Sequence, residues 1–194
     1  MERAAVVGLD MGGQPALAFA ARHPERTLGL AVMNSLLFGD EGTSWEIRLL
    51  RQFGWNRLVL RRLPWLVFKR AERTFLPRGV ALPRDLRADL WDSFRRPEVR
   101  AFISRMCAGY QGTLPRLPEL YAQVRCPTLV LWAGGDRHFP PVHAERRHAA
   151  VPGSRLEVIA GAEHWMPWYL ASEVAQRLRT FFGNTLPAVS APSG

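Results

Sequence analysis

The feature that most constrains this chain is a short segment at residues 4–22. An apolar run over residues 4–7 is typical of a buried parallel strand, and it leads directly into Gly8-Leu9-Asp10-Met11-Gly12-Gly13. An alanine-rich stretch over residues 14–22 follows and predicts a helix. Because glycines stand on both sides of Asp10, the chain can turn sharply from strand to helix. The turn is therefore expected to hold one carboxylate clear of the end of the strand.

The rest of the chain repeats the alternation of strand and helix. Apolar runs predict strands at residues 28–34, 128–132 and 155–159, and helices are expected at residues 141–150 and 166–182. Continuous apolar strands that alternate with helices are typical of a parallel sheet covered on both faces. The predicted fold class is therefore α/β, with about four parallel strands and flanking helices.

A long insertion separates the second predicted strand from the third. Its apolar residues recur at helical spacing, as in Trp45, Leu49 and Phe53, and again in Leu86, Leu90 and Phe94. Proline and glycine interrupt it repeatedly, so several helices are expected rather than one. We divide the chain into a core of residues 1–35 and 125–183, a helical cap of residues 36–124 and a disordered tail of residues 184–194.

The charge is concentrated in the cap. The chain carries a net charge of +9, and residues 46–105, with 15 arginines and lysines against 6 acidic residues, account for all of it. We favour a solvated surface of arginine-rich helices and expect no nucleic-acid partner. Residues 55–65 are basic and aromatic, which is the composition of a segment at a membrane surface. Pro64 interrupts that segment, so a membrane partner is the less favoured interpretation.

The remaining composition indicates an ordinary globular domain. No apolar run approaches the roughly 18 residues of a membrane span, and the N-terminal apolar stretch is too short for a signal peptide. The only cysteines, Cys107 and Cys126, have no metal-binding or disulfide spacing. We therefore expect a cytoplasmic location and no metal.

Two later motifs complete a chemical pattern with Asp10. Asp136 stands in the loop after the third predicted strand, and His164 stands in a loop led by Gly161 after the fourth. The carboxyl ends of parallel strands lie at one edge of a sheet, so these loops are expected to converge there. Simpler interpretations are a helix N-cap for Asp10 and a turn residue for Asp136. His138 competes with His164 for the role of base, but it lacks the glycine-led loop.

Together, these motifs resemble the α/β-hydrolase fold family, in particular its branch with an aspartate nucleophile, which contains epoxide hydrolases and haloalkane dehalogenases. The resemblance rests on Gly8–Gly13, on Trp132-Ala133-Gly134-Gly135-Asp136 with Phe139-Pro140-Pro141, and on Gly161-Ala162-Glu163-His164-Trp165. It implies that Asp10 attacks an sp3 carbon and forms an alkyl ester, and that His164 activates the water that cleaves this ester. Asp136 would orient His164, since Asn34 and Ser35, after the second strand, offer no carboxylate.

The pattern departs from both subfamilies next to the nucleophile. Each usually has tryptophan there, whereas this chain has Met11, which cannot donate a hydrogen bond to a halide. Tyr110, near the end of the cap, stands where an epoxide hydrolase carries a proton-donating tyrosine. Met11, Tyr110 and Trp165 are the candidate substrate-binding residues, and the substrate is expected to be small and hydrophobic. Epoxide hydrolysis is favoured, with haloalkane dehalogenation as the alternative and no cofactor.

The resemblance also implies an N-terminal half that this sequence lacks. In the family, roughly 90 residues with four strands precede the turn, including a His-Gly-x-Pro segment that completes the oxyanion hole. A truncated gene product and a misassigned start are both consistent with the sequence. The strand near Val6 is then expected to form an exposed apolar edge that could pair with another strand. An inactive remnant or binding protein of the same fold remains a second alternative.

Overall fold

A computed structural model describes residues 3–41, 43, 45, 48 and 55–186. Four strands form one sheet in the order β1-β2-β3-β4, and every neighbouring pair is parallel. The strands are β1 (Ala4–Leu9), β2 (Thr27–Met33), β3 (Thr128–Ala133) and β4 (Arg155–Ile159). This sheet confirms the predicted fold class of four parallel strands with flanking helices.

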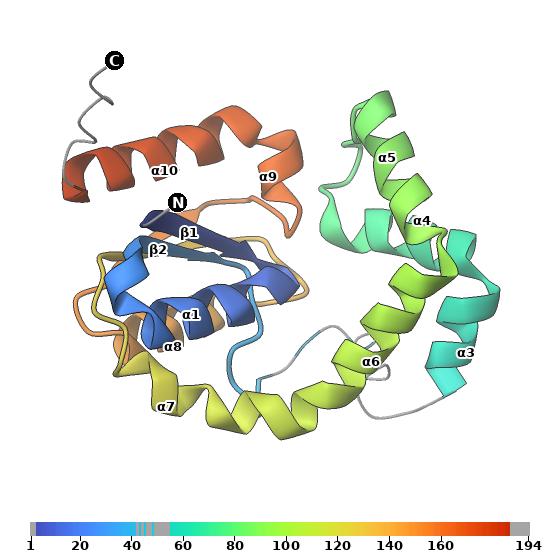
Figure 1. Ribbon diagram of the computed structural model, residues 1–194. Coiled ribbons are helices and arrows are strands. Elements are labelled where there is room, and N and C mark those ends of the chain that lie inside the picture. Colours follow the sequence, from blue (N-terminus) through green and yellow to red (C-terminus); the bar gives the residue numbers. More distant parts are fainter. Residues whose placement is uncertain (1–2, 42, 44, 46–47, 49–54, 187–194) are drawn as a thin grey trace, which may run out of the picture.

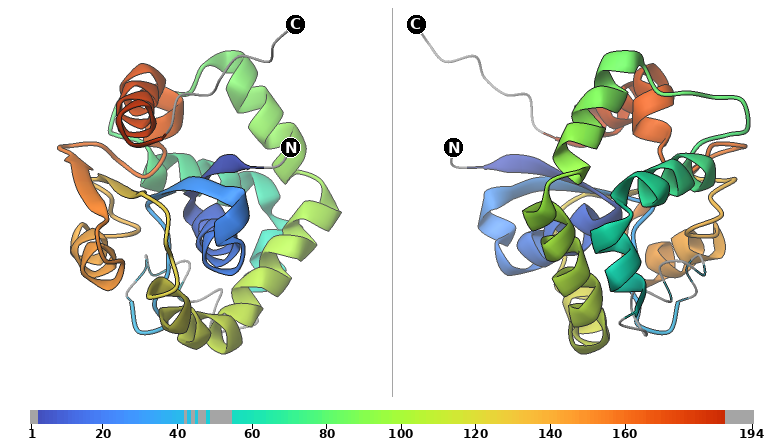
Figure 2. Two further views of the ribbon diagram at one scale, coloured as in Figure 1. Left: turned by 60° about the vertical axis from the view of Figure 1, so that its left-hand side comes forward. Right: turned by 90° about the vertical axis from the view of Figure 1, so that its right-hand side faces the viewer.

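Helices cover both faces of the sheet (Figures 1 and 2). One face is covered by α1 (Gly13–Arg22) and α8 (Val142–Ala150), and the other by α10 (Ala171–Thr185). A short helix, α9 (Met166–Tyr169), precedes α10, and 3-10 turns lie at Asp10–Gly12 and Pro24–Arg26. The strands alternate their side chains between these two faces, so each strand contributes to two separate cores.

The alternation is clearest in the two central strands. From β2, Leu30 and Val32 join the core under α1, while Ala31 and Met33 join the core under α10. In β3, Val130 and Trp132 face α1 and α8, and the alternate residues face α10. All residues of β3 are buried, as expected for a strand with neighbours on both sides and helices on both faces.

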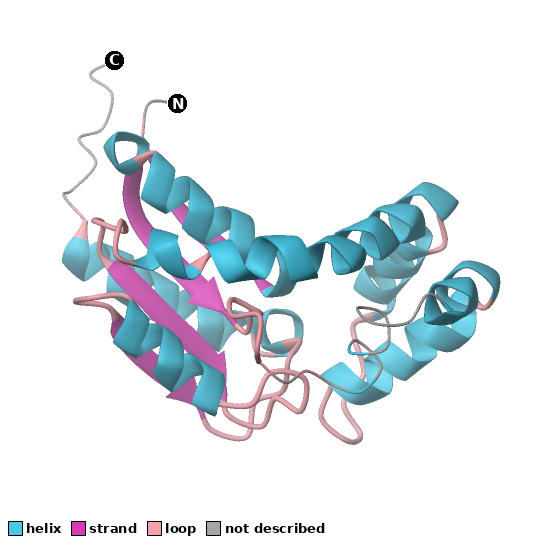
Figure 3. Ribbon diagram, turned by 90° about the horizontal axis from the view of Figure 1, so that it is seen from below, coloured by secondary structure: helices cyan, strands magenta, loops and turns pink. Residues whose placement is uncertain are grey.

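The cap is helical, as the insertion predicts. Its described elements are α3 (Trp55–Arg62), α4 (Pro64–Phe75), α5 (Arg84–Phe94), α6 (Pro97–Thr113), a 3-10 turn (Leu114–Arg116) and α7 (Pro118–Tyr121). Helices α3 to α6 extend to one side of the sheet, and α7 lies beside α1 (Figures 1 and 3). Several begin at a proline, whose fixed φ suits the first helical turn and whose missing N–H costs nothing there.

The ends of the insertion belong to the core rather than to the cap. Leu36, Leu37 and Phe38 pack with Leu114 and Tyr121 in the core under α1. The apolar ends of the segment that was expected to form the cap are thus buried against the sheet layer. The expected helix on Trp45, Leu49 and Phe53 cannot be followed, because Leu49 and Phe53 lie outside the described residues.

Three sequence-based expectations differ from the structure. The first strand is not buried: β1 is an edge of the described sheet, Ala5 is exposed and Val7 is 45% exposed. The single closing helix is instead the pair α9 and α10, separated at Leu170 by a non-helical φ/ψ of −117° and 34°. Helix α10 continues to Thr185, two residues into the expected tail, and residues 187–194 are not described.

The exposed edge of β1 agrees with the expectation for Val6 and its neighbours, although pairing through that edge stays a prediction. In the described part of the chain, no helix combines the length and the apolar character needed to cross a membrane.

The turn after β1 depends on close backbone contact at Gly8. A Cβ atom at this position would lie 2.4 Å from the carbonyl oxygen of Gly12 and 2.7 Å from the Cβ of Ala16. A Cβ at Gly13 would similarly lie 2.3 Å from Ser35 Oγ, whereas one at Gly12 would meet nothing within 4 Å. Gly8 and Gly13 therefore allow α1 to pack directly against the ends of β1 and β2, and Gly12 does not contribute to this packing.

We predict that Gly8→Ala lowers the free energy of unfolding by about 1–3 kcal/mol or more, because the clash is with backbone that cannot move independently. Gly12→Ala is the matched control. Its φ of −76° suits any residue, so we expect a change of less than about 1 kcal/mol. Urea unfolding of both variants checks this, and equal stability of the two would contradict the packing argument.

Candidate active site

Asp10 occupies a strained backbone position at the end of β1. Its φ is 49°, in the left-handed region that residues other than glycine, asparagine and aspartate rarely adopt. The hydroxyl of Ser35 donates a hydrogen bond of 2.6 Å to the Asp10 carbonyl oxygen and holds the turn. The Asp10 side chain is 34% exposed. The turn thus presents the carboxylate partly to solvent, as the strand–glycine–helix pattern predicts.

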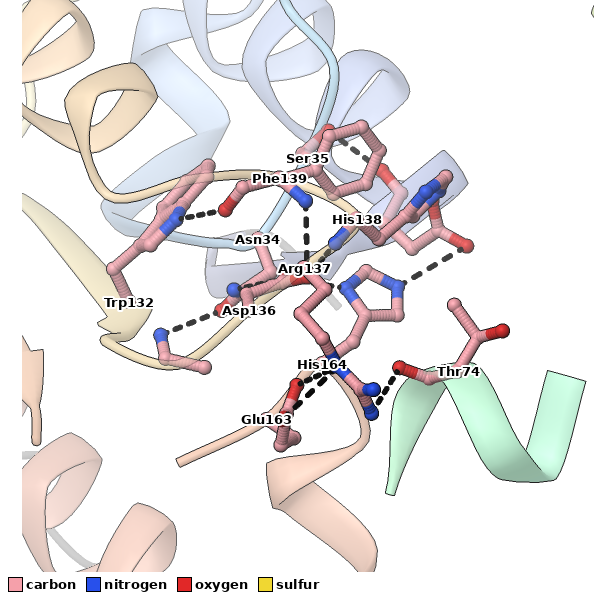
Figure 4. A network of polar contacts seen from close by, with 12 residues as sticks. Asn34, Ser35, Thr74, Trp132, Asp136, Arg137, His138, Phe139, Glu163 and His164 are labelled. Carbon is pink, nitrogen blue, oxygen red and sulfur yellow. Dashed lines mark hydrogen bonds and ion pairs between the residues drawn. The ribbon is translucent and has the colours of Figure 1, made fainter. Parts of the chain in front are cut away.

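His164 lies between the two aspartates. Its Nδ1 is 2.7 Å from Asp136 Oδ2, which is hydrogen-bond distance, and its Nε2 is 3.7 Å from Asp10 Oδ2. The imidazole is fully buried, and Nε2 has no hydrogen-bond partner. Figure 4 shows His164 facing Asp136 from the loop after β4. The structure therefore brings together the three side chains proposed for catalysis, with the free nitrogen of His164 directed toward Asp10.

The Asp136 carboxylate is fully satisfied. Its Oδ1 accepts hydrogen bonds from the backbone N–H groups of His138 and Phe139, at 2.6 and 2.9 Å. Its Oδ2 accepts from Asn34 Nδ2 at 2.6 Å in addition to its bond with His164. Burial raises the pKa of Asp136, but these bonds and the charge of His164 prevail and hold the pKa below its ordinary value. The carboxylate is thus kept ionised inside the protein.

Asn34 is a site residue that the sequence analysis noted only as a missing carboxylate. It follows β2 directly and has a φ of 34°, in the same left-handed region as Asp10. Its amide group donates to Asp136, and its Oδ1 accepts a hydrogen bond from the Ala133 N–H at 3.0 Å. Asn34 therefore fixes Asp136 relative to the end of β3. Its place after a central strand is the one signal that could have identified it.

The protonation of His164 reflects its two neighbours. Burial favours the neutral ring and lowers the pKa, but the hydrogen bond and charge of Asp136 and the nearby carboxylate of Asp10 outweigh it and raise the pKa to about 9. At neutral pH the resting imidazole is consequently protonated. The two aspartates therefore keep the His164 ring protonated as long as both carboxylates are charged.

The cap contacts His164 through Phe75, which lies at the end of α4. The Phe75 ring lies 4.8 Å from the His164 ring and 5.3 Å from the Trp165 ring, between centroids. The Phe75 carbonyl accepts a hydrogen bond from the Trp165 N–H at 3.0 Å. No motif marked Phe75 in the sequence, because its position depends on how the cap packs on the core.

Arg137 provides a second connection between the cap and the core. Its guanidinium donates to the carbonyl oxygens of Arg73 and Thr74, at 3.1 and 3.2 Å, and forms a 3.2 Å ion pair with Glu163 (Figure 4). Arg137, which follows Asp136, thus links Glu163, which precedes His164, to the end of α4.

The three candidate substrate-binding residues lie in different environments. Met11 is half-buried in the 3-10 turn directly after Asp10. Trp165 is half-buried between Phe75 and Trp168, where the cap meets the core. Tyr110, on α6, is buried in the core under α1. A role of these residues toward a substrate stays a prediction.

Comparison with known proteins identifies the family. Residues 2–169 match the α/β hydrolase fold family. The chain belongs to this family. Curated relatives of this α/β hydrolase include a 2-hydroxy-6-oxononadienedioate/2-hydroxy-6-oxononatrienedioate hydrolase of Paraburkholderia phymatum, which is 27% identical over 95% of the chain and 64% of the relative. A 2-hydroxy-6-oxo-6-phenylhexa-2,4-dienoate hydrolase of Comamonas testosteroni is 27% identical over 89% of the chain and 60% of the relative. The chain thus spans less than two thirds of the length of these relatives.

Solved structures agree on the fold of this α/β hydrolase. The 2-hydroxy-6-oxo-6-phenylhexa-2,4-dienoate hydrolase of Rhodococcus sp. strain RHA1 aligns with a TM-score of 0.72 at 20% identity, over 94% of the chain and 64% of that structure. The relatives support the family expected from the sequence but give no support to its branch. They are dienoate and dienedioate hydrolases, and they support a hydrolase without supporting the epoxide hydrolase or dehalogenase branch in particular.

We predict that Asn34→Asp destabilises this α/β hydrolase by about 1–3 kcal/mol at about pH 8, because a second carboxylate would face Asp136. The folded state would then keep a proton that the unfolded chain releases, so the unfolding free energy should rise as the pH is lowered toward about 5. Chemical unfolding at several pH values measures this. Asn184→Asp, at an exposed site on α10, is the control, and its unfolding free energy should follow that of the wild type at every pH.

We further predict that Asp10→Asn lowers the pKa of His164 from about 9, because the substitution removes one of the two negative charges that raise it. Titration of the histidine ring signals by NMR measures the value. An unchanged pKa in the variant would mean that Asp10 does not act on His164 electrostatically.

Proposed function

We propose that this α/β hydrolase forms a covalent ester on Asp10 and hydrolyses it with water activated by His164. The observation that carries the proposal is the alignment of Asp10, His164 and Asp136, with the unpartnered Nε2 of His164 facing the Asp10 carboxylate at 3.7 Å. The favoured substrate is a small hydrophobic epoxide, and an alkyl halide is the alternative.

The first step is an attack by a carboxylate oxygen of Asp10 on an sp3 carbon. A carbon–oxygen bond forms, and the bond from that carbon to the epoxide oxygen breaks. The released alkoxide takes up one proton, for which Tyr110 is the candidate donor from the sequence. With an alkyl halide, halide leaves instead and no proton is needed.

The second step is hydrolysis of the ester. His164 takes a proton from water, and the hydroxide adds to the carbonyl carbon of the esterified Asp10. The tetrahedral intermediate expels the alcohol oxygen, which takes the proton from His164. The carboxylic acid left on Asp10 then returns a proton to His164, so the Asp10 carboxylate and the protonated resting ring are both restored. Asp136 holds Nδ1 of His164, so that Nε2 is the nitrogen that exchanges protons with water.

The charge of Asp10 couples the two steps. In the resting site both aspartates raise the pKa of His164 to about 9, so the ring is protonated at neutral pH and is no base. Esterification makes Asp10 neutral and removes one of these influences. The pKa of His164 then falls and the ring gives up its proton to solvent. The neutral ring can then accept a proton from water at the step where a base is required.

A second candidate comes from the names of the relatives. Hydrolysis of a carbon–carbon bond in a 2-hydroxy-6-oxo-dienoate fits the names of proteins 27% identical to nearly the whole chain. A carboxylate that attacks a carbonyl carbon is itself a good leaving group, so Asp10 would gain little as nucleophile there. His164 would instead have to activate water directly, next to a charged Asp10 that keeps the ring protonated. The residue at position 10 therefore favours the sp3 substrate.

The test is to trap the ester by removing the base. We predict that His164→Gln accumulates an adduct after incubation with an epoxide, because the first step does not need His164 and the second step does. Intact-mass spectrometry should show a gain equal to the full mass of the epoxide. With an alkyl halide, the gain should be smaller by the mass of the hydrogen halide.

The double variant Asp10→Asn/His164→Gln is the control and should stay unmodified with the same compounds. Turnover of a 2-hydroxy-6-oxo-dienoate by the wild type, without any adduct from epoxides or halides in His164→Gln, would favour the second candidate. Neither turnover nor adduct with any of the three classes would favour an inactive remnant or binding protein.

A further inference from the structure

A second histidine faces the same reacting groups. His138 is buried in the loop after Asp136, and its ring stands nearly perpendicular to that of His164, with centroids 5.0 Å apart. One ligating atom from each of Asp10, His138 and His164 can be chosen so that all three atoms lie within 4.8 Å of one another. The mechanism above gives His138 no role, although its side chain lies beside the nucleophile and the base.

The environment of His164 matches that of a metal-binding histidine. Its Nε2 is fully buried, has no hydrogen-bond partner and points toward Asp10. Its other nitrogen bonds Asp136, whose carboxylate is held by three further hydrogen bonds. Metal-binding histidines characteristically pair the second ring nitrogen with a carboxylate in this way, which fixes the ring and makes the ligating nitrogen more basic.

The chemistry of the three ligand groups indicates which kind of ion would bind. Two imidazoles and one carboxylate suit zinc and similar divalent transition metals, whereas calcium and magnesium prefer oxygen ligands alone. Ligand atoms at zinc distances of about 2.0–2.2 Å lie about 3.4 Å apart around a tetrahedral ion. The separation of 3.7 Å between His164 Nε2 and Asp10 Oδ2 is close to this value. Small movements of the Asp10 and His138 side chains would complete three of the four positions.

We propose that Asp10, His138 and His164 form a binding site for one divalent ion of the zinc class, and that this ion switches the hydrolase off. The ion would take the lone pair of His164 Nε2 and displace the proton that this nitrogen carries. It would also engage the Asp10 carboxylate. Nucleophile and base would then be blocked together, and the inhibition would be reversed by a chelator.

The site differs from a catalytic zinc site in one respect. An open fourth position would hold water, but both groups that perform the proposed chemistry would already be bound to the ion. The proposal therefore concerns inhibition and does not depend on whether the substrate is an epoxide, a halide or a dienoate.

Direct binding of zinc tests the site without an activity assay. Isothermal titration of the wild-type chain with zinc chloride should show one ion per chain. His138→Gln keeps the backbone N–H that bonds Asp136 and removes only the imidazole. We predict that it weakens binding by more than about tenfold, the loss that even an outer-shell change commonly causes. His148→Gln, at an exposed histidine on α8, is the matched control and should bind zinc like the wild type.

Two further measurements keep the test decisive if His138→Gln does not fold. Asp10→Asn should also weaken zinc binding, and Co²⁺ bound to the wild type should give the visible absorption of a low-coordinate nitrogen and oxygen site, without a thiolate band from Cys107 or Cys126. Binding that survives both His138→Gln and Asp10→Asn, or a thiolate band, would overturn the proposal. So would the absence of a bound ion in the wild type.

Discussion

The Asp136 carboxylate is the interaction on which the site depends. A buried charge is costly unless its hydrogen-bonding capacity is filled, and Asp136 fills it from three parts of the chain: Asn34 after β2, the backbone of its own loop after β3, and His164 after β4. The carboxyl ends of three neighbouring strands are therefore connected through one group. Because the Asp136 carboxylate also bonds His164, the position of the proposed base is fixed by the carboxyl ends of these three strands.

The chemistry of the site could be predicted from the sequence because it lies in local motifs. Asp10, Asp136 and His164 each follow a strand within a glycine-containing loop, and parallel strands bring such loops to one edge. Asn34 follows a strand but has no glycine-containing loop, and Phe75 has no local signal at all. The importance of Asn34 comes from the sheet register, which pairs Met33 with Leu131 and so sets Asn34 beside the end of β3. Strand register depends on the tertiary structure and cannot be predicted from local sequence. The same holds for the packing of α4 against His164.

The errors in the fold have the same origin. An apolar run predicts a strand, but it does not say how many neighbours that strand has. The run at residues 4–7 alone therefore indicates a buried strand, and only the resemblance points to the exposed edge on which Val7 is 45% exposed. The helical periodicity of residues 166–182 continues through Leu170, where the backbone leaves the helical region and α9 ends. For the function, Asp10 and the relatives indicate different substrates. Overall sequence similarity mostly reflects the scaffold, whereas the reaction depends on a few side chains.

The left-handed φ of residue 10 has a consequence for how such a turn can evolve. Only a few residue types tolerate this conformation, and aspartate and asparagine are among them, which is also true of Asn34 one strand away. A residue that replaces the nucleophile at this position must therefore meet two requirements. Its side chain must be reactive, and its backbone must tolerate a positive φ. Branched or bulky side chains are excluded before their chemistry matters. The turn can exchange one small polar nucleophile for another while the scaffold stays the same, and a family built on it can acquire new reactions through single substitutions at its centre.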